Sequence, residues 1–134
     1  MTLTGAPAVV RDVLAGRADV RVAVLFGSEA RGSSRLHSDI DLAVDAPTVD
    51  LLALRTTLTA TLGREVDLVS LADATIPLLE HLVRDGVVVH EGYAGAGALW
   101  RSRTLATLET DRPWFTRMCD AWLARVAERG LTGG

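Results

Sequence analysis

The chain has 134 residues, of which 49% are hydrophobic and 23% charged, which is enough apolar material for one domain with a single core. Its formal charge of -3 argues against a protein held to nucleic acid or to an anionic membrane by bulk charge. All 14 basic residues are arginine, which excludes a Schiff-base lysine and a lysine-dependent phosphate loop. Any basic side chain that contacts a phosphate must therefore be an arginine.

The cellular compartment is indicated by what the sequence does not contain. The single cysteine, Cys119, cannot form an internal disulfide, and the first residues lack the charged and apolar regions of a signal peptide. No apolar stretch approaches the length of about 20 residues that a membrane-spanning helix needs. We therefore expect a soluble, cytoplasmic protein that does not contact a membrane.

The first half of the chain alternates between helix and strand patterns. Residues 7–16 carry apolar positions at helical spacing between a proline and a glycine. Strands are predicted over 20–26 and 40–44, where β-branched residues dominate. Thr48 can cap a helix that runs to Leu62, where the following glycine ends it.

The next segment repeats this alternation. A strand is predicted over 65–70, and either Asp73 or Thr75 can cap a short helix around 77–85. A last short strand follows over 87–90. This order predicts an α/β (α+β) fold, with a small mixed β-sheet flanked by helices.

The C-terminal third has a helical pattern from about 99 to 129, after a joint at 93–97. Asp111 and Pro113 indicate either a second helix start or a kink near residue 112. No repeat or change in composition marks a second domain. We therefore expect residues 1–134 to form a single domain, with a core over about 1–92 and a C-terminal helical appendage over about 95–130.

Three aspartates interrupt strands that are otherwise apolar. Asp39 and Asp41 are two residues apart, so they share one face of their strand with Cα atoms roughly 6.6–7 Å apart. Asp67 lies between Val66 and Leu68 in a later strand. An ionised carboxylate that is buried without a partner is costly, and a bound cation is an economical compensation. The oxygen ligands suit Mg²⁺ or Mn²⁺, and a pair of such ions is a common device for phosphoryl or nucleotidyl transfer.

A simpler interpretation exists for each aspartate taken alone. Asp39 could cap a turn, and Asp41 and Asp67 could be solvated residues on an open sheet face. The three together, following a Gly-Ser turn, favour a catalytic metal site in which Asp67 also accepts the proton of an attacking hydroxyl.

The Gly27-Ser28 turn directly follows a predicted strand, so its backbone N–H groups and the serine hydroxyl could face a phosphate chain. A Gly-Ser pair alone is weak evidence, because most are ordinary turns. The ten residues between Ser28 and Asp39 allow the chain to return and place the carboxylates beside the same phosphates. Arg31 and Arg35 lie in this connection and could hold phosphate oxygens, although both could equally be solvated; Arg31 is the better candidate.

These residues together resemble the signature of the DNA polymerase β-like nucleotidyltransferase superfamily. The stretch FGSEARGSSRLHSDIDLAV is most similar to the MntA-type antitoxins, minimal nucleotidyltransferases encoded beside HEPN-domain toxins. The resemblance is dense in motifs over residues 20–70 and loose in the C-terminal third. Ser34 is a departure, since relatives often carry a small apolar residue there.

The resemblance implies transfer of AMP from ATP to a tyrosine hydroxyl of the cognate HEPN ribonuclease toxin, which silences the toxin. It implies that Gly27 and Ser28 hold the triphosphate and that Asp39 and Asp41 bind two Mg²⁺ ions. Asp67 takes the position of third metal ligand and base. The complete set of acidic residues indicates an active enzyme.

Two other functions are open. A nucleotidyltransferase acting on a small alcohol such as an aminoglycoside needs the same metal site, but such enzymes commonly carry a larger helical domain. A non-catalytic antitoxin could neutralise its partner by covering it with the C-terminal helices. Direct nucleic-acid binding is not expected of so small an acidic chain.

The remaining residues of interest have simpler interpretations. His37 is expected to be solvated, His81 and His90 lack metal-ligand spacing, and Cys119 is expected to be a small core residue. Tyr93 could be a self-modification site but is more simply a packing residue. Trp114 and Trp122, with Phe115 and Met118 close by, form a stripe that is usually core, with a partner interface as the alternative.

Overall fold

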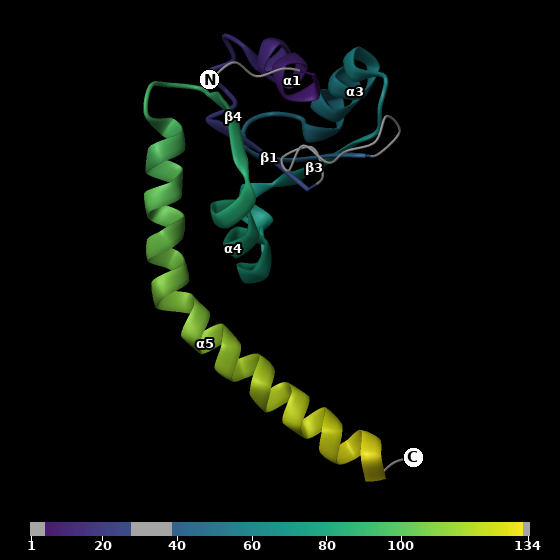
Figure 1. Ribbon diagram of the computed structural model, residues 1–134, viewed down its shortest axis with the longest axis vertical. Helices are drawn as coiled ribbons and strands as arrows, with labels where there is room; N and C mark the ends of the chain where they lie inside the picture. Colours follow the sequence, from purple (N-terminus) through teal and green to yellow (C-terminus); the bar gives the residue numbers. More distant parts are fainter. Residues whose placement is uncertain (1–4, 28–38, 133–134) are drawn as a thin grey trace.

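A four-stranded mixed sheet lies among the helices in the upper part of Figure 1. The computed structural model describes residues 5–27 and 39–132. The strands are β1 (Val22–Phe26), β2 (Ile40–Asp45), β3 (Val66–Ser70) and β4 (Val87–Glu91). The helices are α1 (Ala6–Leu14), α3 (Leu51–Leu62), α4 (Ile76–Asp85) and α5 (Ala96–Thr132), with a short 3-10 helix, η1 (Leu71–Asp73).

The strand order is β3-β2-β1-β4. β1 is antiparallel to both β2 and β4, whereas β2 and β3 are parallel. Parallel neighbours need a crossover connection, and α3 supplies it. The predicted mixed sheet with flanking helices is confirmed.

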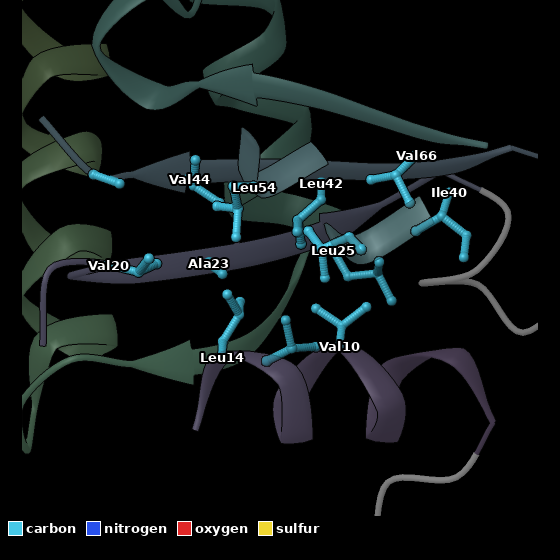
Figure 2. Packing of buried hydrophobic residues seen from close by; sticks show 13 residues of the cluster. Val10, Leu14, Val20, Ala23, Leu25, Ile40, Leu42, Val44, Leu54 and Val66 are labelled. Carbon is cyan, nitrogen blue, oxygen red and sulfur yellow. The ribbon is translucent and has the colours of Figure 1, made fainter. Parts of the chain in front are cut away.

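One face of the sheet is covered by α1 and α3, and the larger apolar core lies there. Figure 2 shows Val10 and Leu14 of α1 pointing toward the sheet, where Ala23 and Leu25 of β1 meet them. Ile40, Leu42 and Val44 of β2 face the same core, together with Val66 of β3. Because side chains alternate along a strand, the intervening residues of β2 and β3 must face the opposite side.

The opposite face of the sheet is covered by α4 and the first part of α5. Val22, Val24 and Ala43 of the sheet pack there against Leu82 of α4 and Ala96 of α5. This second core covers only part of the face. The end of the sheet where β1 finishes and β2 begins carries the acidic residues.

Two helix starts are settled by their capping hydrogen bonds. Asp50 caps α3, because its Oδ1 accepts from the backbone N–H groups of Leu52 at 3.0 Å and Ala53 at 3.2 Å. The predicted cap, Thr48, was wrong, since it lies in the turn two residues before the cap position. At α4 the cap is Thr75, whereas Asp73 belongs to η1.

α5 is continuous from Ala96 to Thr132, so of the two alternatives left open near residue 112 a second helix start is excluded. Pro113 lies inside it, where it removes one backbone hydrogen bond and crowds the preceding turn. Figure 1 shows α5 bending midway and running well beyond the rest of the molecule, which fits the predicted kink. The joint before α5 ends at Gly95, whose φ of 84° is left-handed. In the described part of the chain, no helix is both long and apolar enough to cross a membrane.

Two polar side chains fix the positions of strands. Arg55 of α3 donates from Nε to the Val66 carbonyl at 3.0 Å, and its Nη2 lies 3.4 Å from a Glu65 carboxylate oxygen. His90 is buried, and its Nε2 lies 3.0 Å from the Arg17 carbonyl and 2.9 Å from the Val20 carbonyl. Since both partners are acceptors, Nε2 carries the proton and donates to them. His90 is therefore a structural residue.

Candidate active site

Asp41 and Asp67 lie side by side on neighbouring strands. They are register partners in the parallel pairing of β2 and β3, so their Cα atoms are about one strand spacing, roughly 4.8 Å, apart. Their sequence neighbours Ile40, Leu42 and Val66 point into the α1/α3 core. Both carboxylates therefore share the opposite face of the sheet, the α4 side.

Asp39 joins them from the residue just before β2. Asp39 is exposed and Asp67 is exposed, whereas Asp41 is half-buried between them and the body of the sheet. Burial raises the pKa of Asp41 above its ordinary value, and the negative charges of Asp67 and Asp39 raise this pKa further. The three carboxylates are thus close enough to repel one another, which a shared cation would reverse.

Gly27 closes the site from the end of β1. Its φ is 76°, and a Cβ atom built on it would overlap Asp41 Oδ2. Only glycine combines this left-handed conformation with such a close approach of the backbone to the carboxylate. The backbone of Gly27 therefore lies directly against Asp41.

The donor set fits divalent magnesium or manganese, which prefer carboxylate oxygens. Within residues 5–27 and 39–132, no three histidine, cysteine, aspartate or glutamate side chains are already gathered closely enough to hold a metal ion. Asp39 and Asp67 are exposed, so their side chains can change rotamer without disturbing the core. The residues that would hold the ions are Asp39, Asp41 and Asp67.

Five residues singled out in the sequence lie in the segment 28–38, outside the described residues. They are Ser28, Arg31, Ser34, Arg35 and His37. The roles of Ser28 and Arg31 at the triphosphate stay predictions. Of the predicted nucleotide-binding residues, Gly27 is described, and it lies beside the acidic group.

His81 lies closer to the site than its sequence context indicated. Phe26 is the register partner of Asp41 on the β1 side, and the His81 ring meets the Phe26 ring edge to face, with centroids 6.2 Å apart. His81 Nδ1 lies 3.3 Å from an Asp85 carboxylate oxygen. The spacing of His81 and Asp85, four residues apart on a helix, was the available signal for this pair. Together with Phe26, the pair forms a wall near the acidic residues on the α4 side.

The predicted core positions in the C-terminal helix were wrong. Trp114, Met118 and Trp122 are exposed, and Cys119 is half-buried. Tyr93 is also exposed, in the turn that precedes α5. The helical stripe was identified correctly, but nothing in the described part of the chain covers it.

The fold is that of a nucleotidyltransferase, and comparison with family models identifies the family. Residues 9–92 match the family model described as Polymerase beta, Nucleotidyltransferase, so the chain belongs to that family. The matched region contains Gly27 and all three aspartates. A search of the curated proteins found no match.

Similar folds occur in solved structures of toxin-antitoxin complexes. A chain from a toxin-antitoxin crystal structure with AMP-PNP is 24% identical, with a TM-score of 0.71, over 87% of this chain and 98% of that one. A chain of the MntA-HepT toxin-antitoxin pair is also 24% identical, with a TM-score of 0.65, over 88% and 97% of the two chains. A third comes from the Shewanella oneidensis complex of a tri-AMPylated HEPN toxin with its MNT antitoxin, at 23% identity and a TM-score of 0.64, over 88% and 95%.

Proposed function

We propose that this chain is an antitoxin that transfers AMP from ATP to a tyrosine hydroxyl of a cognate HEPN-domain toxin and so inactivates its ribonuclease. The observation that carries the proposal is the acidic group: Asp41 beside Asp67 across the parallel strands, with Asp39 on the same face and Gly27 against Asp41. The family supports nucleotidyl transfer. The solved relative bound to a tri-AMPylated HEPN toxin supports the choice of acceptor.

The reaction forms one bond and breaks one. The acceptor hydroxyl oxygen attacks the α-phosphorus of ATP, the bond from that phosphorus to the β-phosphate breaks, and pyrophosphate leaves. Asp67 accepts the hydroxyl proton, and Asp39 and Asp41 position the reactants together with it. Mg²⁺ ions, when bound by these carboxylates, would neutralise the charge that develops on the phosphates. Ser28 and Arg31 are proposed to hold the triphosphate.

The test is incubation of the purified chain with labelled ATP, Mg²⁺ and the purified cognate HEPN-domain protein. We expect label on a toxin tyrosine and loss of ribonuclease activity. The Asp39→Asn variant should transfer less than about 1% of the wild-type label, because it lacks a proposed metal ligand. Equal labelling by the two proteins would refute the enzymatic mechanism.

A second candidate is a binding antitoxin that neutralises its partner without chemistry. The exposed tryptophans of α5 favour this candidate, because they offer a contact surface. The same experiment separates the two, since a binding antitoxin inhibits the ribonuclease without ATP and without label. The cytoplasmic location stays a prediction in both cases.

A further inference from the structure

The second half of α5 extends beyond the domain without covering any part of it (Figure 1). Leu108 is the last α5 residue with a buried side chain among those described. From 109 to 127 every described side chain is exposed, apart from the half-buried Cys119. We call residues 109–132 the distal arm.

The distal arm carries a coherent apolar face. Among the arm's described side chains, the exposed large apolar ones are Trp114 (60%), Met118 (45%), Trp122 (56%), Leu123 (55%) and Val126 (44%). At about 100° per residue, these five positions fall within half of the helix circumference. Scattered surface residues do not concentrate on one side in this way.

The apolar face continues the face with which α5 packs on the domain. Ala96, Trp100, Thr104 and Leu108 are spaced four residues apart and are buried or partly buried. Projected at about 100° per residue, they occupy the same arc as Trp114, Met118, Trp122 and Val126. The buried face of the first part of α5 and the exposed apolar face of the distal arm thus share one arc of the helix, which Asp111 and Arg125 interrupt, and the domain covers only the first part.

A hollow lies where the arm leaves the domain. It measures about 240 Å³ and is lined by Asp45 at the end of β2 and by residues of η1, α4 and α5, including Leu71, Leu79, Trp100 and Thr104. Trp100 and Thr104 belong to the shared arc of α5. A partner that lies along the arm would therefore reach a recess at its root that can accept a side chain.

The size of the exposed apolar area indicates whether a second copy of this chain or a different protein covers the distal arm. Two tryptophans more than half exposed and three aliphatic side chains leave on the order of 400 Å² of apolar surface. Pairing of two arms would bury that area from each copy, about half of the roughly 800 Å² per partner of a standard interface. A partner seated between the arm and α4 gains the hollow and the α4 surface as well.

The arm also leaves the domain on the side of the sheet where the carboxylates lie. α4 and α5 cover this face, and Asp41 and Asp67 point to it. A protein held along the arm is thereby brought to the face where nucleotidyl transfer would occur. Trp and Arg are the residues favoured at the centre of such contacts, and Arg125 lies exposed within the same arc.

We propose that the distal arm and the hollow at its root form the docking surface for the acceptor protein, which this inference takes to be the HEPN-domain toxin of the proposed function. The acceptor would present an apolar groove to the tryptophans, with a carboxylate facing Arg125.

The test compares three variants with the wild-type chain, using the purified cognate HEPN-domain protein of the proposed function as the probe. Trp114→Ala/Trp122→Ala removes both aromatic rings, and Met118→Glu places a charge on the same face while favouring helix. The control, Arg117→Ala/Asp120→Ala, changes exposed residues on the other side of the arm. Circular dichroism confirms that each variant keeps its helix content.

Binding is measured by calorimetry, and AMP transfer by the KM for the acceptor and kcat. The tryptophan double variant and Met118→Glu should raise Kd and KM by about 100-fold, as expected for loss of central aromatic contacts, with kcat changed by less than about 2-fold. The control should match the wild type. Unchanged Kd in both face variants would overturn the inference.

The proposed function and the proposed docking surface can be refuted independently. If the wild-type chain binds the HEPN-domain protein but transfers no AMP, the enzymatic proposal is refuted. The Kd values of the variants then still test whether the distal arm is the docking surface. The variant Asp39→Asn should bind with wild-type Kd and lose transfer. If light scattering shows a wild-type dimer that the face variants convert to monomer, with acceptor binding unchanged, the arm is a self-association surface and the inference is refuted.

Discussion

Replacing Gly27 by alanine tests how the turn and the acidic group depend on each other. Two effects combine at this position: the left-handed φ of 76° strains any residue with a Cβ, and the new methyl group would overlap Asp41 Oδ2. The backbone strain alone costs roughly 1–2 kcal/mol. The overlap must be relieved by moving the turn or the carboxylate, and Asp41 is the half-buried member of the site.

Gly16 provides a matched control, because its φ is 80° and a Cβ there would meet nothing within 4 Å. Gly16→Ala should lose about 1–2 kcal/mol of stability, or roughly 3–8 °C in Tm, with AMP transfer unchanged within about 2-fold. Gly27→Ala should lose at least as much stability and also about 100-fold in transfer, because a displacement of about 1 Å in a reacting group can cost that much.

Thermal melting followed by circular dichroism, and transfer of labelled AMP to the acceptor, measure the two effects. Equal transfer by Gly27→Ala and Gly16→Ala would show that the contact between the turn and Asp41 has no catalytic importance. The physical account of the site would then be wrong even if the aspartates proved essential.

Three further predictions concern charge, burial and capping. The folded state raises the pKa of Asp41 above 3.8, so the stabilising effect of its protonation is complete at low pH and is lost as the pH rises through the folded pKa. The Tm of Asp41→Asn should therefore exceed that of the wild type at pH 7, and the difference should shrink toward pH 3.5. Mg²⁺ should raise the Tm of the wild type only. His90→Ala should lose about 1–3 kcal/mol in a denaturant titration, because it leaves the buried Val20 carbonyl and the partly buried Arg17 carbonyl without their donor, while kcat is retained. Asp50→Ala should cost about 1 kcal/mol and Thr48→Ala almost nothing, and similar losses in both would contradict the assigned cap.

The secondary structure was predictable because its signals are local. Apolar alternation, the prolines and the glycines at 63 and 86 placed every strand and α-helix boundary within a few residues, whereas η1 was not predicted. The cap of α3 was missed because Thr48 and Asp50 are both good capping residues, and only the geometry of the preceding turn chooses between them. At Pro113 the sequence allowed two outcomes, and the continuous helix selects the kink.

The acidic site was predictable in composition but not in geometry. The spacing of Asp39 and Asp41 fixes their common face, whereas the position of Asp67 beside Asp41 depends on strand order and register, which are long-range properties. The contact of Gly27 with Asp41 could not be read from the sequence for the same reason. The exposed tryptophans were misassigned because an amphipathic stripe has the same pattern whether its cover comes from this chain or from another.

Arg55 helps to keep Asp67 on the correct face of the sheet, although it lies on the other side. It lies on the face opposite the carboxylates, and its hydrogen bond to the Val66 carbonyl anchors the outer border of β3 to α3. Slippage of β3 by one position would invert its side chains and bury Asp67 among the leucines of α3. A substitution at Arg55 is therefore expected to abolish activity from the opposite face of the sheet by displacing Asp67, although all three aspartates remain in the sequence.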